Sequence, residues 1–146
     1  MSETVDPLAR MHSAEHVLNA VMQRDFGTGR SIEAHFGSRK SKCDYVLSRA
    51  VTDADVEAIQ RAVNAEIDAD HRVTTFEISR GDAEAAYDMG KVPDDARTIR
   101  IVRIGDLDAI PCVGRHVEHT AQIGRFVIRS ADMRNETVVR IRFTLE

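Results

Sequence analysis

The sequence predicts an α+β fold in which an antiparallel or mixed sheet carries helices on one face, giving two layers. Two helical stretches, at residues 7–26 and 52–70, are separated by segments in which apolar and polar residues alternate. Alternation with a period of two is typical of half-buried strands, and paired strands between helices favour an α+β domain. The 146 residues contain no repeat or linker. We therefore expect a single domain spanning residues 1–146.

The first helix carries the most informative residues of the N-terminal half. Asp6 precedes Pro7, and an Asp N-cap with Pro in the first turn is typical of a helix start. Apolar residues then recur with a period near 3.6, and Gly27 indicates the C-terminal stop. His12 and His16 lie four residues apart on this helix, so both imidazoles are expected on one face at the edge of the core.

The remaining elements follow from the same two periodicities. The second helix begins at Thr52, an N-cap residue followed by acids in the first turn. The other expected elements are strands at 31–36, 43–47, 73–79, 98–104, 121–128 and 138–143, a short helix at 81–89 and an irregular segment at 105–115.

Composition restricts the class of protein. Hydrophobic residues make up 42% of the chain and charged residues 30%, as in an ordinary soluble globular protein. No apolar run approaches the length of a membrane span, and residues 1–10 lack the pattern of a signal peptide. Two cysteines form no disulfide framework. We therefore expect a cytoplasmic protein without a membrane partner.

The charge of the chain is unevenly distributed. The net charge is -4, yet residues 97–146 hold nine arginines and only six acidic residues. Arginine forks match phosphate oxygens, so this part of the chain could supply a phosphate-binding face. The alternative, which has equal weight, is that these arginines are only solvent-exposed residues on the outer faces of strands.

A second pair of candidate metal ligands lies far from the first. Cys112 and His116, four residues apart, follow Pro111 in the irregular segment. With His12 and His16 they would supply imidazoles and one thiolate, a ligand set typical of zinc. A lone histidine pair is more often a surface or packing feature. The second pair, which uses one of only two cysteines, favours a shared zinc site.

These motifs also carry a family resemblance. HxxxH near the N-terminus and CxxxHVxxTxxIG near the C-terminus resemble the editing domain shared by alanyl- and threonyl-tRNA synthetases and its freestanding AlaX-type relatives. The resemblance covers nearly the whole chain and implies the fold of the second additional domain of these synthetases. The matching residues are His12, His16, Cys112, His116, Val117, Thr120, Ile123 and Gly124.

The resemblance implies an aminoacyl-tRNA deacylase. Such a protein would use Zn²⁺ to hydrolyse the ester of mischarged tRNA, in particular Ser-tRNA(Ala) or Gly-tRNA(Ala), in trans and without ATP. The partner would be tRNA, in particular tRNA(Ala). The oligomeric state stays open, with a homodimer as one alternative.

Two segments depart from the family pattern. Val113-Gly114-Arg115 replaces the usual Gly-Gly-Thr, and Thr120-Ala121-Gln122 replaces Thr-Gly-Glu. Neither change affects the four expected ligands, but both lie where substrate or RNA would be contacted. The resemblance therefore leaves the amino acid that is removed undetermined.

Further residues are weaker candidates, and each has a plain surface role as its alternative. Glu15 is a candidate proton shuttle, and His119 is a candidate partner that would orient a metal ligand, or an alternate ligand itself. The candidate contacts to substrate or tRNA are Ser31, His35, Arg115, Thr120 and Arg125.

Two other functions remain open at this stage. One is a non-enzymatic RNA-binding module in which zinc only stabilises a loop. The other is a metal hydrolase of small aminoacyl or amide substrates that does not use RNA. A zinc ion with four protein ligands would argue for a structural role, whereas a labile ligand would allow catalysis.

Overall fold

The computed structural model describes residues 5–90 and 92–146. Residues 1–4, on which the signal-peptide prediction partly rests, lie outside the described residues. The elements in chain order are α1 (Pro7–Phe26), β1 (Glu33–Phe36), β2 (Lys40–Val46), α2 (Asp53–Asp68), β3 (Val73–Ser79), α3 (Arg80–Ala86), β4 (Thr98–Ile104), β5 (Asp108–Pro111), the 3₁₀ helix η1 (Thr120–Ile123), β6 (Phe126–Met133) and β7 (Val138–Leu145).

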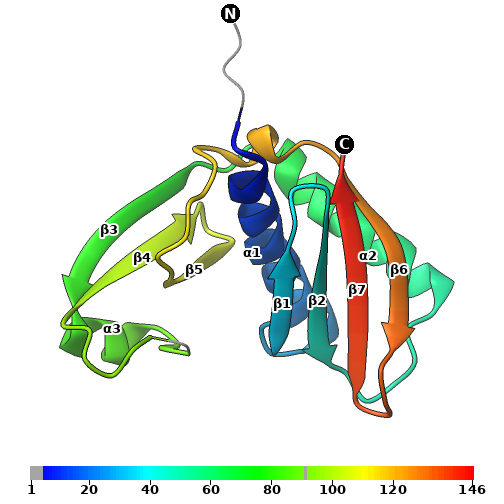
Figure 1. Cartoon of the computed structure of the whole chain (residues 1–146), viewed down its shortest axis with the longest axis horizontal. Coiled ribbons are helices and arrows are strands. Elements are labelled where there is room, and N and C mark those ends of the chain that lie inside the picture. The colour runs from blue at the N-terminus through cyan, green and yellow to red at the C-terminus, as the bar shows by residue number, and fades with distance from the viewer. Residues whose placement is uncertain (1–4, 91) are drawn as a thin grey trace, which may run out of the picture.

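The strands form two antiparallel sheets. The larger sheet has the order β1-β2-β7-β6, and the smaller one has the order β3-β4-β5. Figure 1 shows α1 and α2 behind the larger sheet, with the smaller sheet and α3 forming a separate wing beside α1. The predicted α+β class with antiparallel pairing is therefore confirmed, but the strands divide between two sheets.

Local signals fix the ends of the two long helices. The Asp6 carboxylate accepts the N–H of Leu8 at 3.0 Å, and Gly27 adopts a left-handed φ of 66° at the other end of α1. At the start of α2, Thr52 and Asp55 exchange side-chain hydrogen bonds with each other's backbone N–H, a capping box. Both helix starts were predicted from these residues.

The core lies between the two long helices and the larger sheet. Helix α1 packs a nearly continuous buried face, from Met11 to Met22, against β2, β7 and α2. A second, smaller core around Ile99 and Ile101 supports the wing formed by β3, β4 and α3. Among the described residues, no helix is long and apolar enough to cross a membrane.

Two sequence predictions are corrected near the C-terminal motif. The strand expected at 121–128 starts only at Phe126, because residues 120–123 form η1 and Gly124, at a φ of 91°, turns the chain. The segment expected to be irregular contains β5, which pairs with β4. This pairing carries the chain back towards α1, and no local pattern in the sequence indicates it.

Candidate metal centre

The structure brings the four predicted ligands together. His12 and His16 project from α1, and Cys112 and His116 lie in the loop after β5. One donor atom from each residue lies within 4.8 Å of all the others. The Sγ atom of Cys112 is 3.5 Å from Nε2 of His12 and 3.5 Å from Nε2 of His116.

These distances fit a tetrahedral ion. A zinc ion lies about 2.3 Å from sulfur and about 2.0–2.1 Å from nitrogen, which puts the sulfur about 3.5 Å from each nitrogen across a tetrahedron. Both observed sulfur–nitrogen distances equal this value. Three imidazoles and one thiol also match the ligand preference of zinc. The cluster could therefore bind a metal ion of this kind.

The histidines are oriented by groups behind them. Nδ1 of the buried His16 lies 3.3 Å from the carboxylate of Asp108, although no described group completes a well-aligned hydrogen bond to it. Arg30 holds the same carboxylate through two hydrogen bonds of 2.8 and 3.2 Å. Nδ1 of His116 lies 2.9 Å from the hydroxyl oxygen of Ser13. Such partners fix the ring orientation of metal-binding histidines.

The loop that carries Cys112 is held from both sides. The Arg100 side chain donates hydrogen bonds to the carbonyls of Cys112 and Gly114, at 2.8 and 2.9 Å. Gly114 packs directly against the imidazole of His12, where a Cβ atom would overlap the ring. The glycine retained in this segment is therefore required by the close approach of loop and helix.

Charges within the cluster favour a thiolate. Burial opposes ionisation of Cys112, but its contacts with His116, His12 and His16 outweigh burial and lower the pKa of the thiol to about 3. Burial also lowers the pKa of His16, but Asp108 and Cys112 outweigh it and raise that pKa to about 9. Burial is the main reason that the pKa of His116 falls to about 4. Metal binding at the imidazole of His16 must therefore release a proton.

The cluster borders a cavity of about 560 Å³ between α1, β1 and the wing. His12, His16 and Cys112 line it, together with residues of β1, of the segment before β4, and of β4 and β5. Most of the other walls are apolar, with Phe36, Ile99 and Ile110 among them. A ligand in this cavity would lie against the metal ligands.

Two of the seven weaker candidates line this cavity, and the other five do not. Glu15 and Ser31 are both part of its wall. His35 is exposed on the opposite face of β1, because strand alternation directs Ala34 and Phe36 to the cavity instead. The strand expected at 31–36 begins only at Glu33, so Ser31 precedes it.

The residues of the C-terminal motif have mainly structural contacts. Thr120 is fully buried, and its hydroxyl accepts the N–H of His71 and contacts the last carbonyls of α2. His119 pairs with Asp70 instead of reaching the metal cluster. In this structure η1 packs the Thr120 side chain under the end of α2, and its expected contact to substrate or tRNA stays a prediction.

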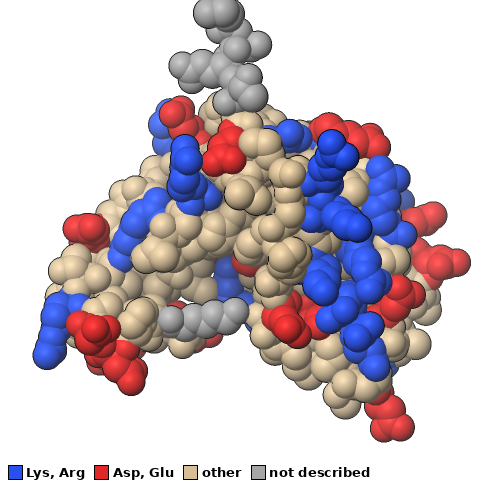
Figure 2. Space-filling model, in the orientation of Figure 1, with Lys and Arg blue, Asp and Glu red and all other residues tan. Residues whose placement is uncertain are grey.

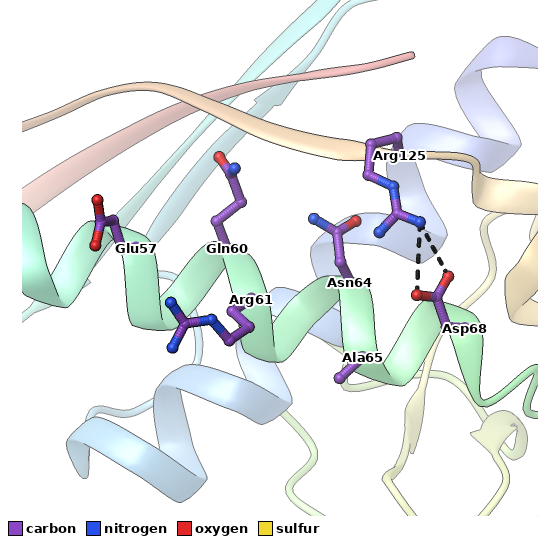
Figure 3. A pocket seen from close by; sticks show the side chains of 7 residues that line it. All are labelled: Glu57, Gln60, Arg61, Asn64, Ala65, Asp68 and Arg125. Carbon is purple, nitrogen blue, oxygen red and sulfur yellow. Dashed lines mark hydrogen bonds and ion pairs between the residues drawn. The ribbon is translucent and has the colours of Figure 1, made fainter.

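The predicted arginines lie outside the cavity. Arg115 is 84% exposed and its guanidinium lies 3.3 Å from the Asp6 carboxylate. Arg125 pairs with Asp68 at 3.2 Å in a separate groove of about 450 Å³ along α2, as Figure 3 shows. In Figure 2, Lys and Arg side chains gather over the outer face of the larger sheet. That face includes Lys42 and Arg142, which lie opposite each other on β2 and β7.

Sequence reasoning missed four residues of the site: Ser13, Arg30, Arg100 and Asp108. The only signal for Asp108 was its position four residues before Cys112. Nothing in the sequence indicated that Arg30 would reach it across 78 residues. These contacts depend on how β5 and the loop after it return to α1.

The fold and the four-residue cluster together define a two-layer α+β domain with a metal-type site beside a cavity. The family model described as Threonyl and Alanyl tRNA synthetase second additional domain matches residues 99–142. The chain belongs to this editing-related domain family of alanyl- and threonyl-tRNA synthetases.

Similarity to curated proteins extends over most of the chain. It is 30% identical over 141 residues to an alanine–tRNA ligase of Metallosphaera sedula and 31% identical over 141 residues to one of Aeropyrum pernix. Each match covers 93% of this chain. The chain spans 16% of the length of each of these ligases, so the match concerns one region of them.

Proposed function

We propose that this protein hydrolyses the ester bond between a wrong amino acid and the terminal ribose of tRNA, acting in trans on Ser-tRNA(Ala) or Gly-tRNA(Ala). The observation that carries the proposal is that three of the four clustered ligands also line the cavity. The relation to alanine–tRNA ligases supports tRNA as the partner.

The resident metal in this proposal is zinc, held by His12, His16, Cys112 and His116. When bound, zinc polarises an ester carbonyl or lowers the pKa of water. The chain itself supplies the positioning. The Asp108–Arg30 pair holds His16 from behind, and Ser13 holds His116.

The cavity also offers a group that distinguishes serine from alanine. The Ser31 hydroxyl has no hydrogen-bond partner among the described side chains and backbone groups, whereas its backbone N–H donates to Asn19 at 3.2 Å. Asn19 is in turn held by the Tyr45 hydroxyl at 2.6 Å. In this proposal the hydroxyl of a seryl group bonds to Ser31, and an alanyl group leaves Ser31 unpaired.

A deacylation panel tests the proposal. Zinc-loaded protein is mixed with Ser-, Gly- and Ala-tRNA(Ala) and with mischarged tRNA(Thr), and loss of the aminoacyl group is followed under single-turnover conditions. We expect faster hydrolysis of Ser-tRNA(Ala) than of Ala-tRNA(Ala). Ser31→Ala should slow the seryl reaction about tenfold and leave the glycyl reaction unchanged. Exposed Ser38→Ala is the matched control. Equal rates on the seryl and alanyl substrates, or hydrolysis only of mischarged tRNA(Thr), would refute the proposal.

A second function has one observation in its favour. The cluster offers four protein ligands, and a complete set of four is typical of structural zinc sites. In that case the protein would be an RNA-binding module whose metal only holds the loop after β5 to α1. Binding of tRNA without any deacylation in the panel above would support this alternative.

A further inference from the structure

One carboxylate of the cavity has no protein partner. Glu15 lies on α1 between the two histidine ligands and is only 7% exposed. Its side chain lines the cavity. None of the described residues gives it a hydrogen bond or an ion pair, although buried carboxylates are normally paired.

Among the described residues, no Lys or Arg side chain pairs with Glu15, although its charge helps to raise the pKa of the neighbouring His16. Arg30 also lines the cavity, but its guanidinium is taken up by both oxygens of Asp108. Burial, and after it the charge of Glu15, raises the pKa of the Cys43 thiol, so this neighbour stays neutral. The hydroxyl of Tyr45, another buried neighbour, is already bonded to Asn19. The carboxylate of Glu15 is therefore open only towards the cavity.

Glu15 lies on the same helix as two of the expected metal ligands and lines the same cavity. Glu15 follows His12 by three residues and precedes Asn19 by four on α1, and side chains at these spacings are neighbours on one helix face. His16 is likewise four residues from His12 and three from Asn19. All four line the cavity. An α-amino ester carries its ammonium group one carbon away from the carbonyl. A carbonyl at the metal ligands would therefore bring the ammonium group beside Glu15.

We propose that Glu15 is a binding subsite for the ammonium group of the aminoacyl moiety. This inference rests on the proposed function, since it assumes that the aminoacyl group enters the cavity. It adds a requirement that a hydrolase of simple esters would not have: the substrate must carry a positive charge near the scissile carbonyl. Blocking the amine leaves the buried carboxylate without its partner. This loss weakens binding more than the loss of a hydrogen bond between neutral groups does.

Stable analogues allow the subsite to be tested by binding alone. Three amides of 3′-amino-3′-deoxyadenosine are compared by calorimetry with the zinc-loaded protein: the alanyl, the propionyl and the β-alanyl forms. The alanyl form carries an α-ammonium group, the propionyl form has none, and the β-alanyl form moves it out by one carbon. We expect the alanyl form to bind at least about tenfold more tightly than the propionyl form. Tighter binding of the β-alanyl form would instead assign the subsite to an ammonium group on an amino-acid side chain.

A pair of variants assigns the preference to one side chain. Glu15→Gln should bind the alanyl and propionyl forms equally, with zinc content and melting temperature like the wild type. Glu33→Gln, which changes an exposed carboxylate of β1, should keep the preference. Equal binding of the two forms by the wild type, no binding of any form, or a preference retained by Glu15→Gln would overturn the inference. The wild-type comparison holds even if a variant fails to fold.

Failure of the subsite and failure of the proposed reaction are distinguishable. Ammonium-dependent binding without deacylation of any mischarged tRNA would refute the reaction and leave the subsite. Deacylation of Ser-tRNA(Ala) without any ammonium preference would refute the subsite alone.

Discussion

Replacement of Gly114 by alanine tests whether the loop and α1 meet around a metal ion. A Cβ atom at this position would overlap the ring of His12. Carbon atoms in contact are normally about 4 Å apart, so the imidazole would have to retreat by roughly 1 Å or more. Metal–ligand distances tolerate only about 0.2 Å, and His12 would therefore cease to be a ligand.

The size of the effect follows from the number of ligands. Structural zinc sites with four ligands have apparent binding free energies of about 10–16 kcal/mol, so each ligand accounts for roughly 3 kcal/mol. Loss of His12 should then weaken zinc binding by about a hundredfold. Titration against a chromophoric chelator measures this change directly.

The matched control for this variant is Gly29→Ala. A Cβ atom at Gly29 meets nothing within 4 Å, so zinc binding should be unchanged. Zinc binding by Gly114→Ala as tight as that of the wild type would contradict this prediction, because His12 could not then be a ligand in the position observed.

Three further predictions concern other parts of the molecule. Asp108→Asn should weaken zinc binding about 10–100-fold in the same titration, because His16 loses the carboxylate behind it; unchanged affinity would show that Asp108 does not orient the ring. Arg115→Ala should weaken tRNA binding and lower its salt slope by about one unit in filter binding, with zinc content unchanged, and normal binding at every salt concentration would exclude a phosphate contact. Arg49 and the backbone N–H of Thr52 lower the pKa of Asp55 to about 2, so Asp55 stabilises the fold above about pH 4 and this contribution disappears as the pH falls to about 2. Asp55→Asn should thus lower the free energy of unfolding by at most about 1 kcal/mol at pH 7. Urea melts should show that this difference disappears near pH 2.

The parts of the site that were predictable are those encoded locally. The spacing of His12 and His16 on a helix fixes both side chains on one face, whatever the rest of the chain does. The pair Cys112 and His116 could be recognised by its ligand types and spacing alone. Helix starts at Asp6 and Thr52 likewise depend on contacts within a few residues.

What could not be predicted depends on long-range pairing. The division into two sheets is set by which strands meet, and alternating residues indicate a strand without naming its partner. Asp108 reaches His16 only because β5 pairs with β4 and returns the chain to α1. The burial of Thr120 was likewise unpredictable, since it arises from the packing of η1 against α2.

We propose that His12, His16, Cys112 and His116 hold one zinc ion at the wall of the cavity. X-ray absorption at the zinc edge of the purified protein tests this proposal. We expect one sulfur at about 2.3 Å and three nitrogens at about 2.0–2.1 Å, with about one zinc per chain. A spectrum without a sulfur neighbour, or with two, would contradict it, as would a protein that purifies without metal and keeps normal stability.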